Sequence, residues 1–396
     1  MTPPNQARPE RGRRSEFLIF GSPAIGEEEI AEVVATLRSG WLGTGPRVQR
    51  FEADFRAYVG CAHAVALNSC TAGLHLALAV LGIGQGDEVI TTPLTFSATA
   101  NVIVHVGAKP VFADVERRTM SLDPEAVAQA VTPRTKAILP VHLAGRPCDM
   151  DALLQVARGH GLAVVQDAAH AIEARYRGRP IGSIGDLTVF SFYVTKNLVT
   201  GEGGMLTTEN ASWAEEIRIK ALDGISRDAW KRYSAEGFQP YDTLFPGYKY
   251  NMTDMQAALG IHQLARLEAN LVVRERHWRR YDAAFTGHPL LTLPAPADPR
   301  DRHARHLYTV LLDVERAGMS RNEFVARLKA ENIGTGIHFT ALHLHSYYAK
   351  TFGFTRGQFP AAEFIGDRTV SLPLSAKLTD EDLEDVIAAL FRVLPS

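Results

Sequence analysis

The feature that most constrains the fold is an alternation of short apolar runs with amphipathic segments between about residues 25 and 210. Segments such as Pro124–Ala130 and Met150–His160 have the apolar spacing of helices. Strands that alternate with helices are typical of an α/β domain, in which a mostly parallel sheet carries helices on both faces. The strands are expected at Ala64–Leu67, Glu88–Thr91, Pro110–Asp114, Ala137–Val141, Ala163–Gln166, Leu187–Phe192 and Met205–Thr208.

A second, smaller α+β domain is expected in the C-terminal part. Apolar residues at helical spacing run from Thr253 to Arg280, and the proline-rich stretch Leu293–Pro299 follows them. The remainder favours a strand at Leu307–Leu312, a helix at Ser320–Glu331, a strand near Ile337 and a last helix at Asp380–Val393. We therefore expect a disordered tail at residues 1–16, a large domain at 17–260 and a small domain at 261–396.

Composition excludes several classes of protein. Lys+Arg number 42 and Asp+Glu 44, so the net charge of −2 provides no basic surface for nucleic acid or anionic lipid. The first residues are polar and basic with no apolar core of a targeting signal, and the most apolar stretch, Leu74–Ile83, is far shorter than the roughly 20 residues of a membrane span. Cys61, Cys70 and Cys148 are odd in number and widely spaced, which favours buried thiols over disulfides or a zinc site. These features predict a soluble, cytoplasmic protein.

One segment is a candidate anion site. Asn68–Gly73 follows an expected strand and opens an expected helix, where backbone N–H groups and the Thr71 hydroxyl can bind phosphate. Taken alone, this segment favours an N-cap without a ligand. The glycine-rich stretch Gly82–Asp87 leads into a strand rather than a helix, so we exclude it as a dinucleotide loop.

Two further segments carry chemistry. Asp167 ends an apolar strand, where a carboxylate needs a cation, or alternatively caps a helix. Lys196 lies between an apolar strand and a loop with Gly201, Gly203 and Gly204, and desolvation there lowers the pKa of a lysine enough for it to form a Schiff base. A Schiff-base lysine with an aspartate on a pyridinium nitrogen is the recurring arrangement for pyridoxal phosphate. The residues thus favour this cofactor, with its phosphate at Ser69, Thr71 and Ser191.

The chain resembles the sugar aminotransferases of the DegT/DnrJ/EryC1/StrS family, which are fold-type-I enzymes that depend on pyridoxal phosphate. The resemblance extends from about residue 17 to the end and rests on these motifs: Gly40–Pro46, Thr95–Ala100, Pro140–Gly145, Asp167–His170, Ser191–Gly204, Gly247–Asp254 and Ser371–Leu374.

The resemblance implies a role for each matching residue around the cofactor. Lys196 would bind the cofactor and later move the proton, and Asp167 would keep the ring nitrogen protonated. His170 would contact the side of the phenolic oxygen, and Phe96 would stack on the ring, although an aromatic residue here could also belong to the core. The phosphate would be bound by residues Ser69, Cys70, Thr71, Ala72 and Ser191.

The resemblance also implies a partner subunit and a substrate. Lys249 and Asn251 match a segment that reaches the phosphate of the partner, which implies a homodimer with shared active sites, and their identities resemble the subgroup that aminates C4 of UDP-sugars. The substrate would contact Thr44, Tyr193 and His338, although His338 could equally be a surface-loop histidine. Tyr193 replaces a histidine of some close relatives.

The expected reaction is a ping-pong transfer of the amino group of L-glutamate to a nucleotide-linked keto-sugar, with pyridoxamine phosphate as the intermediate. Amination at C3, amination of a cyclitol ketone, and a catalytically silent regulator that binds the cofactor stay as alternatives, whereas Lys196 argues against a dehydratase of the same family. No metal is expected, because His303, His306, His343 and His345 lack supporting ligands at known spacing.

Overall fold

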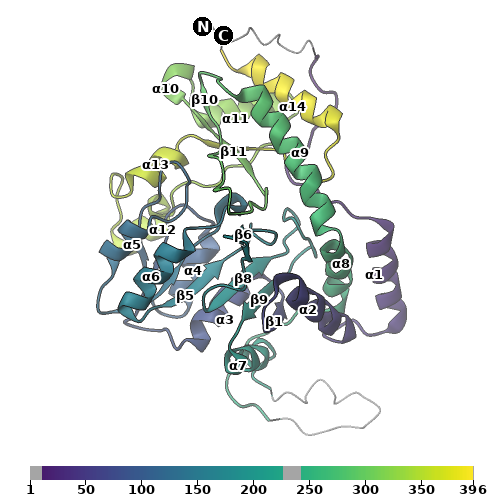
Figure 1. The fold of residues 1–396 in the computed structure, drawn as a ribbon, viewed down its shortest axis with the longest axis vertical. Coiled ribbons are helices and arrows are strands. Elements are labelled where there is room, and N and C mark those ends of the chain that lie inside the picture. Colours follow the sequence, from purple (N-terminus) through teal and green to yellow (C-terminus); the bar gives the residue numbers. More distant parts are fainter. Residues whose placement is uncertain (1–10, 226–241, 396) are drawn as a thin grey trace.

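The computed structural model describes residues 11–225 and 242–395, and its central element is a sheet of seven strands (Figure 1). β9 runs antiparallel to its neighbours β1 and β8, whereas β8, β5, β4, β2 and β3 pair in parallel. The α/β class is therefore confirmed, and all seven predicted strands are present within two residues of their expected bounds. In spatial order the strands are β1 (His63–Leu67), β9 (Gly204–Thr208), β8 (Leu187–Ser191), β5 (Ala163–Asp167), β4 (Thr135–Leu139), β2 (Glu88–Thr91) and β3 (Lys109–Phe112).

Successive side chains of a strand pack into two apolar cores, one on each face of the sheet. On β8, Val189 contributes to the core formed with α3 (Cys70–Val80) and α7 (Ala211–Ala221). The next residue, Phe190, contributes to the core formed with α2 (Pro46–Val59) and α8 (Asp254–Ala265), because side chains of a strand point to opposite faces in turn. The sheet is thus buried on both faces, as expected of parallel strands.

Further helices accompany this sheet, and a short hairpin is formed by β6 (Arg175–Tyr176) and β7 (Arg179–Pro180). The expected helices at residues 124–130 and 150–160 are confirmed with the predicted bounds. The helices are α1 (Glu27–Ser39), α4 (Ser97–His105), α5 (Pro124–Ala130) and α6 (Met150–His160), with a 3₁₀ turn at Leu143–Gly145.

A second, antiparallel sheet contains β10 (Leu291–Thr292), β11 (Tyr308–Leu312) and β12 (Thr369–Leu372). Figure 1 shows α9 (Leu267–Phe285) running from the first sheet to this part of the molecule, where it lies beside α14 (Asp380–Val393). The other helices are α10 (Val314–Ala317), α11 (Arg321–Ala330), α12 (Ser346–Phe352) and α13 (Pro360–Gly366), with a 3₁₀ turn at Leu342–Leu344.

Two expectations for this part were wrong. The expected helical stretch from Thr253 to Arg280 is two helices, because the backbone leaves the helical conformation at Arg266, where φ is −100° and ψ is −1°. The expected strand near Ile337 is reduced to an isolated bridge between Gly336 and Ser371, because the loop that follows turns toward a cavity rather than continuing along β12.

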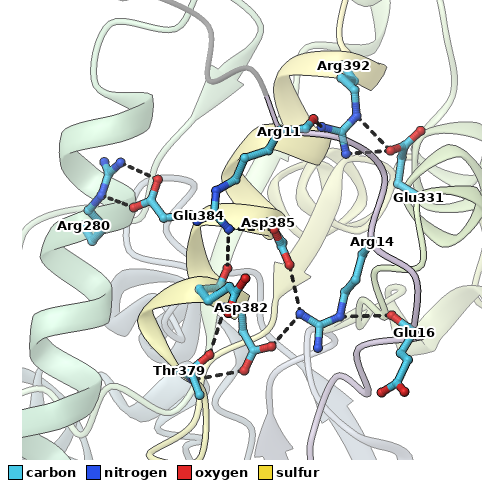
Figure 2. Close-up of polar contacts among 11 residues, drawn as sticks. Arg11, Arg14, Glu16, Arg280, Glu331, Thr379, Asp382, Glu384, Asp385 and Arg392 are labelled. Carbon is cyan, nitrogen blue, oxygen red and sulfur yellow. Dashed lines mark hydrogen bonds and ion pairs between the residues drawn. The ribbon is translucent and has the colours of Figure 1, made fainter.

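The described residues of the expected tail lie against α14 (Figure 2). Arg14 Nη1 is 2.6 Å from Asp382 and 3.0 Å from Asp385, and Arg11 Nη1 is 2.9 Å from Asp385. The domain division stays a prediction, and its boundary at residue 260 falls within α8. No helix in the described part of the chain is both long and apolar enough to cross a membrane.

Candidate active site

A cavity of about 840 Å³ lies between the two sheets, at the carboxyl ends of β5 and β8. The large sheet supplies Asp167 and Ser191 at these strand ends, and the C-terminal part supplies His306 and His338. Carboxyl ends of strands in an open α/β sheet are the usual place for a ligand site. The cavity wall brings together these predicted residues: Ser69, Cys70, Thr71, Phe96, Asp167, His170, Ser191, Tyr193, Lys196 and His338.

Asp167 is buried at the end of β5, and its carboxylate accepts from three donors, of which the Cys70 thiol is the most distant, with Sγ 3.9 Å from Oδ1. Thr99 Oγ1 donates to Oδ2 at 2.8 Å, and the Ala169 amide donates to Oδ1 at 3.1 Å. Burial raises the pKa of the Asp167 carboxyl, and the hydrogen bond from Thr99, the Ala169 amide and the charge of Lys196 each offset part of that rise. A cationic N–H facing this carboxylate would stabilise its charged form further.

Lys196 lies in a tight turn between β8 and β9. Its amide donates to the Tyr193 carbonyl at 2.8 Å, and the Tyr193 amide donates to Ser191 Oγ at 3.4 Å. Desolvation lowers the pKa of Lys196, and the nearby Asp167 carboxylate counteracts this effect. A lysine amine whose pKa is lowered in this way is more available as a nucleophile or base near neutral pH.

The predicted anion site lies at the start of α3. Ser69 is the N-cap, and its Oγ accepts from the Ala72 amide at 3.0 Å, so that Ala72 is occupied within the helix rather than facing the cavity. The amides of Cys70 and Thr71 belong to the first turn, where N–H groups have no acceptor inside the helix and attract anions.

The three glycines of the lysine loop have different roles in the structure. Gly203 lines the cavity, and Gly201 adopts a positive φ of 81° in the turn. A Cβ on Gly204 would lie 2.6 Å from the Cys70 backbone nitrogen, so glycine is needed for β9 to pass the start of α3.

Phe96 and His338 line the cavity, so neither the core alternative for Phe96 nor the surface alternative for His338 holds. Phe96 is 62% exposed and its ring centroid lies 6.3 Å from that of Phe339. His338 Nδ1 is 2.9 Å from Ser371 Oγ, and desolvation lowers its pKa to about 4.

Thr44, Lys249 and Asn251 lie outside the cavity. Lys249 and Asn251 are on the segment beside β1, and Thr44 is in the loop between α1 and α2. Asn251 Nδ2 donates to Thr44 Oγ1 at 2.7 Å, and Thr44 Oγ1 donates to the Met252 carbonyl. Lys249 is exposed, and its Nζ lies 4.0 Å from Asp223 Oδ2. Within one chain these residues do not reach the site.

The sequence did not identify several residues of the site. Thr99 bonds to Asp167, and Asn197 bonds to His306, in each case across a long stretch of sequence. Arg274 lines the cavity and pairs with Glu173. For His306 the sequence suggests only a metal role, which its spacing argues against. Asp114, which also follows a strand, instead accepts from the Ala361 and Ala362 amides at the start of α13, both at 2.9 Å.

The donor set fits pyridoxal phosphate. The Lys196 amine can bind the aldehyde, and the buried Asp167 carboxylate can pair with the protonated ring nitrogen. The backbone N–H groups at the start of α3 can bind the phosphate. Among residues 11–225 and 242–395, no group of three or more side chains could hold a metal ion. Cys61, Cys70 and Cys148 are buried and free.

Over residues 23–391 the sequence matches the DegT/DnrJ/EryC1/StrS aminotransferase family. The chain belongs to this family. It is a pyridoxal-phosphate-dependent aminotransferase of fold type I, as its resemblance to the family implied, and pyridoxamine phosphate is the other form of its cofactor.

Individual relatives are similar to this chain in sequence along nearly its whole length. The spore coat polysaccharide biosynthesis protein SpsC of Bacillus subtilis (strain 168) is 54% identical over 379 residues, which cover 96% of this chain and 97% of SpsC. The PMP form of Spr1654 from Streptococcus pneumoniae, provisionally described as a sugar aminotransferase, is 37% identical with a TM-score of 0.88 and covers 95% and 98% of the two chains. DesV of S. venezuelae, solved with a ketimine intermediate, is 37% identical with a TM-score of 0.84 and covers 92% and 94%.

Proposed function

We propose that this aminotransferase moves the amino group of L-glutamate to the keto carbon of a nucleotide-linked keto-sugar, in two half-reactions. The observation that carries the proposal is the presence of Lys196 and Asp167 at one cavity of about 840 Å³, within the range of roughly 300–1,000 Å³ that suits a small-molecule ligand. The names of two relatives, a polysaccharide biosynthesis protein and a sugar aminotransferase, support a sugar as the amino acceptor.

When bound, pyridoxal phosphate supplies an electron sink that stabilises negative charge on the substrate carbon. Lys196 is the group that takes the proton from that carbon and returns it, because its lowered pKa leaves the amine available as a base. Asp167 holds a proton on the ring nitrogen through its negative charge, and the first turn of α3 orients the phosphate.

We further propose a homodimer with shared active sites. Thr44, Lys249 and Asn251 lie outside the cavity of their own chain, as expected of residues that serve the site of a partner. On α1, Ile30, Val34 and Leu37 are exposed apolar residues at helical spacing, a pattern that favours contact with another chain. The cytoplasmic location expected from the sequence stays a prediction.

C4 is the proposed position of amination, on the Lys249 and Asn251 pattern. The test is turnover of L-glutamate with a panel of UDP- and dTDP-linked 4-keto and 3-keto sugars and a cyclitol ketone, with the product position assigned by NMR. Amination at C4 supports the proposal, and amination only at C3 or of the cyclitol contradicts it. The Lys196→Ala variant is the control, and its rate should fall at least about 100-fold, since general acid–base transfer contributes roughly 10²–10⁴-fold.

A further inference from the structure

Two buried histidine rings lie against each other at the cavity wall. The ring centroids of His170 and His306 are 4.4 Å apart, with an angle of 35° between the planes. His170 follows β5, whereas His306 precedes β11 in the C-terminal part of the chain. The family resemblance implies a role for His170 beside the phenolic oxygen, whereas His306 has no role in the proposed reaction.

The structure fixes the tautomer of His170. Its Nδ1 lies 3.2 Å from the Ala144 backbone amide, which can only donate. Nδ1 therefore carries the lone pair, and the proton of the neutral ring is on Nε2.

A chain of hydrogen bonds from Glu173 through Asn197 to His306, called the relay below, fixes His306 in the opposite tautomer. Asn197 Nδ2 lies 2.8 Å from Glu173 Oε2 and 3.0 Å from the Ala304 carbonyl. A carboxylate and a carbonyl only accept, so the amide nitrogen must face them and Asn197 Oδ1 must face His306 Nδ1, at 2.9 Å. His306 Nδ1 therefore carries the proton, and Nε2 carries the lone pair.

Burial, and after it the charge of Lys196, keeps the His306 ring neutral. Desolvation lowers the pKa of His306 well below its ordinary value, and the charge of Lys196 lowers it further. The relay does not reverse this effect, because the Glu173 carboxylate is paired with the buried Arg274 guanidinium. The charge of Arg274 acts in the same direction as that of Lys196.

We propose that His306 is a positioning residue for Lys196, and that its Nε2 accepts a hydrogen bond from the Lys196 amine while that amine carries the transferred proton. Asn197 follows Lys196 directly in the chain and bonds to His306, so the relay ties the ring to the lysine turn. The two histidines then present one donor and one acceptor to the cavity. This inference rests on the proposed function, because Lys196 carries that proton only during amino transfer.

The first test is the protonation of His306, measured by ¹⁵N NMR of the holoenzyme with labelled histidine near pH 7. The signals are assigned by their loss in His306→Asn. We expect a protonated Nδ1 and an unprotonated Nε2, and a changed tautomer in Asn197→Leu, which removes the acceptor. A protonated Nε2 or a cationic ring in the wild type would overturn the proposal. His338 serves as a reference, because its partner, the Ser371 hydroxyl, can donate or accept.

The second test compares two variants of His306 in the half-reaction with L-glutamate. His306→Asn keeps an amide N–H toward Asn197 but has no group at the position of Nε2, whereas His306→Gln can place an amide oxygen near that position. We expect His306→Asn to lower the rate constant about 10- to 100-fold, as for loss of one hydrogen bond to a charged group, with KM for glutamate nearly unchanged. His306→Gln should recover most of the rate.

The positioning role would be overturned if the rate constant fell equally in both variants, if His306→Asn kept the wild-type rate constant, or if only KM changed. Failure of the proposed function gives a different result. If no keto-sugar is aminated, the NMR measurement still reports the tautomer, and the glutamate half-reaction needs no sugar.

Discussion

At the scale of single residues, Asp167 depends on a hydroxyl from another part of the chain. Thr99, on α4, donates to its carboxylate at 2.8 Å. Thr99→Val removes this donor, so the pKa of Asp167 rises further and the carboxylate pairs less well with the ring nitrogen. We expect the affinity for pyridoxal phosphate, measured by titration of the apoenzyme, to fall about 10- to 100-fold. Thr99→Ser keeps the hydroxyl and should bind like the wild type, and equal affinity of the valine variant would contradict this role.

A second prediction at this scale concerns His142 and the dependence of the free energy of unfolding on pH. The Cys148 amide donates to its Nδ1 at 3.0 Å, and its Nε2 lies 3.0 Å from Gln166 Oε1. Desolvation lowers the pKa of His142 from 6.5 to about 4. The unfolded chain therefore binds a proton that the folded chain does not, so the stability contributed by neutral His142 is full above about pH 6.5 and is lost as the pH falls toward 4.

The measurement is urea unfolding at about pH 8 and pH 5, where this one group should account for a loss of about 2 kcal/mol. His142→Asn should lose correspondingly less between the same pH values. The same pH dependence in both proteins would show that His142 does not contribute.

The sequence predicted Lys196, Asp167 and Ser191 correctly as neighbours, because each follows or ends an apolar strand and carboxyl ends of parallel strands meet. It could not predict Thr99 or Asn197 as their supports. These contacts join segments up to 109 residues apart, such as Asn197 and His306, and no local pattern marks them.

At the scale of secondary-structure elements, a buried ion pair links α9 to the segment between β5 and β6. Arg274 and Glu173 are almost completely buried and form a salt bridge. Arg274→Met leaves the Glu173 carboxylate buried without its cation, which should lower the free energy of unfolding by about 3–5 kcal/mol. Urea unfolding measures this change.

Arg276 on the same helix provides the matched control. It pairs with Asp380 at 2.9 Å at the surface, where both side chains are more than half exposed. Arg276→Met should change the stability by no more than about 1 kcal/mol. Comparable losses in the two variants would contradict the role assigned to the buried pair.

The bounds of helices and strands were predicted well where the apolar pattern is strong. They were predicted less well where tertiary contacts determine the local backbone conformation. α5, α6 and α14 begin and end as expected. The strand near Ile337 is absent because that segment lines the cavity, and the break between α8 and α9 has no proline or glycine to mark it.

At the scale of the whole molecule, the proposed homodimer predicts an interface on α1. Leu37 on α1 is 53% exposed, and Ile30 lies on the same helix face. A double variant, Ile30→Glu with Leu37→Glu, should shift the enzyme from dimer to monomer in light scattering and abolish most of the activity, because a buried charge at an interface is strongly unfavourable. Val272→Glu, at a residue on α9 that is 67% exposed, is the control and should leave the dimer intact. A double variant that stays dimeric would place the interface elsewhere.

We expect Lys196 to bind pyridoxal phosphate and L-glutamate to convert the cofactor to its amino form. The most direct measurement is the absorption spectrum of the purified enzyme before and after L-glutamate, beside the Lys196→Ala variant. We predict a long-wavelength band of lysine-bound cofactor that glutamate replaces with the band of pyridoxamine phosphate, and no lysine-bound band in the variant. A wild-type enzyme that shows no cofactor band after addition of pyridoxal phosphate, or a band that glutamate leaves unchanged, would contradict these roles of Lys196 and glutamate.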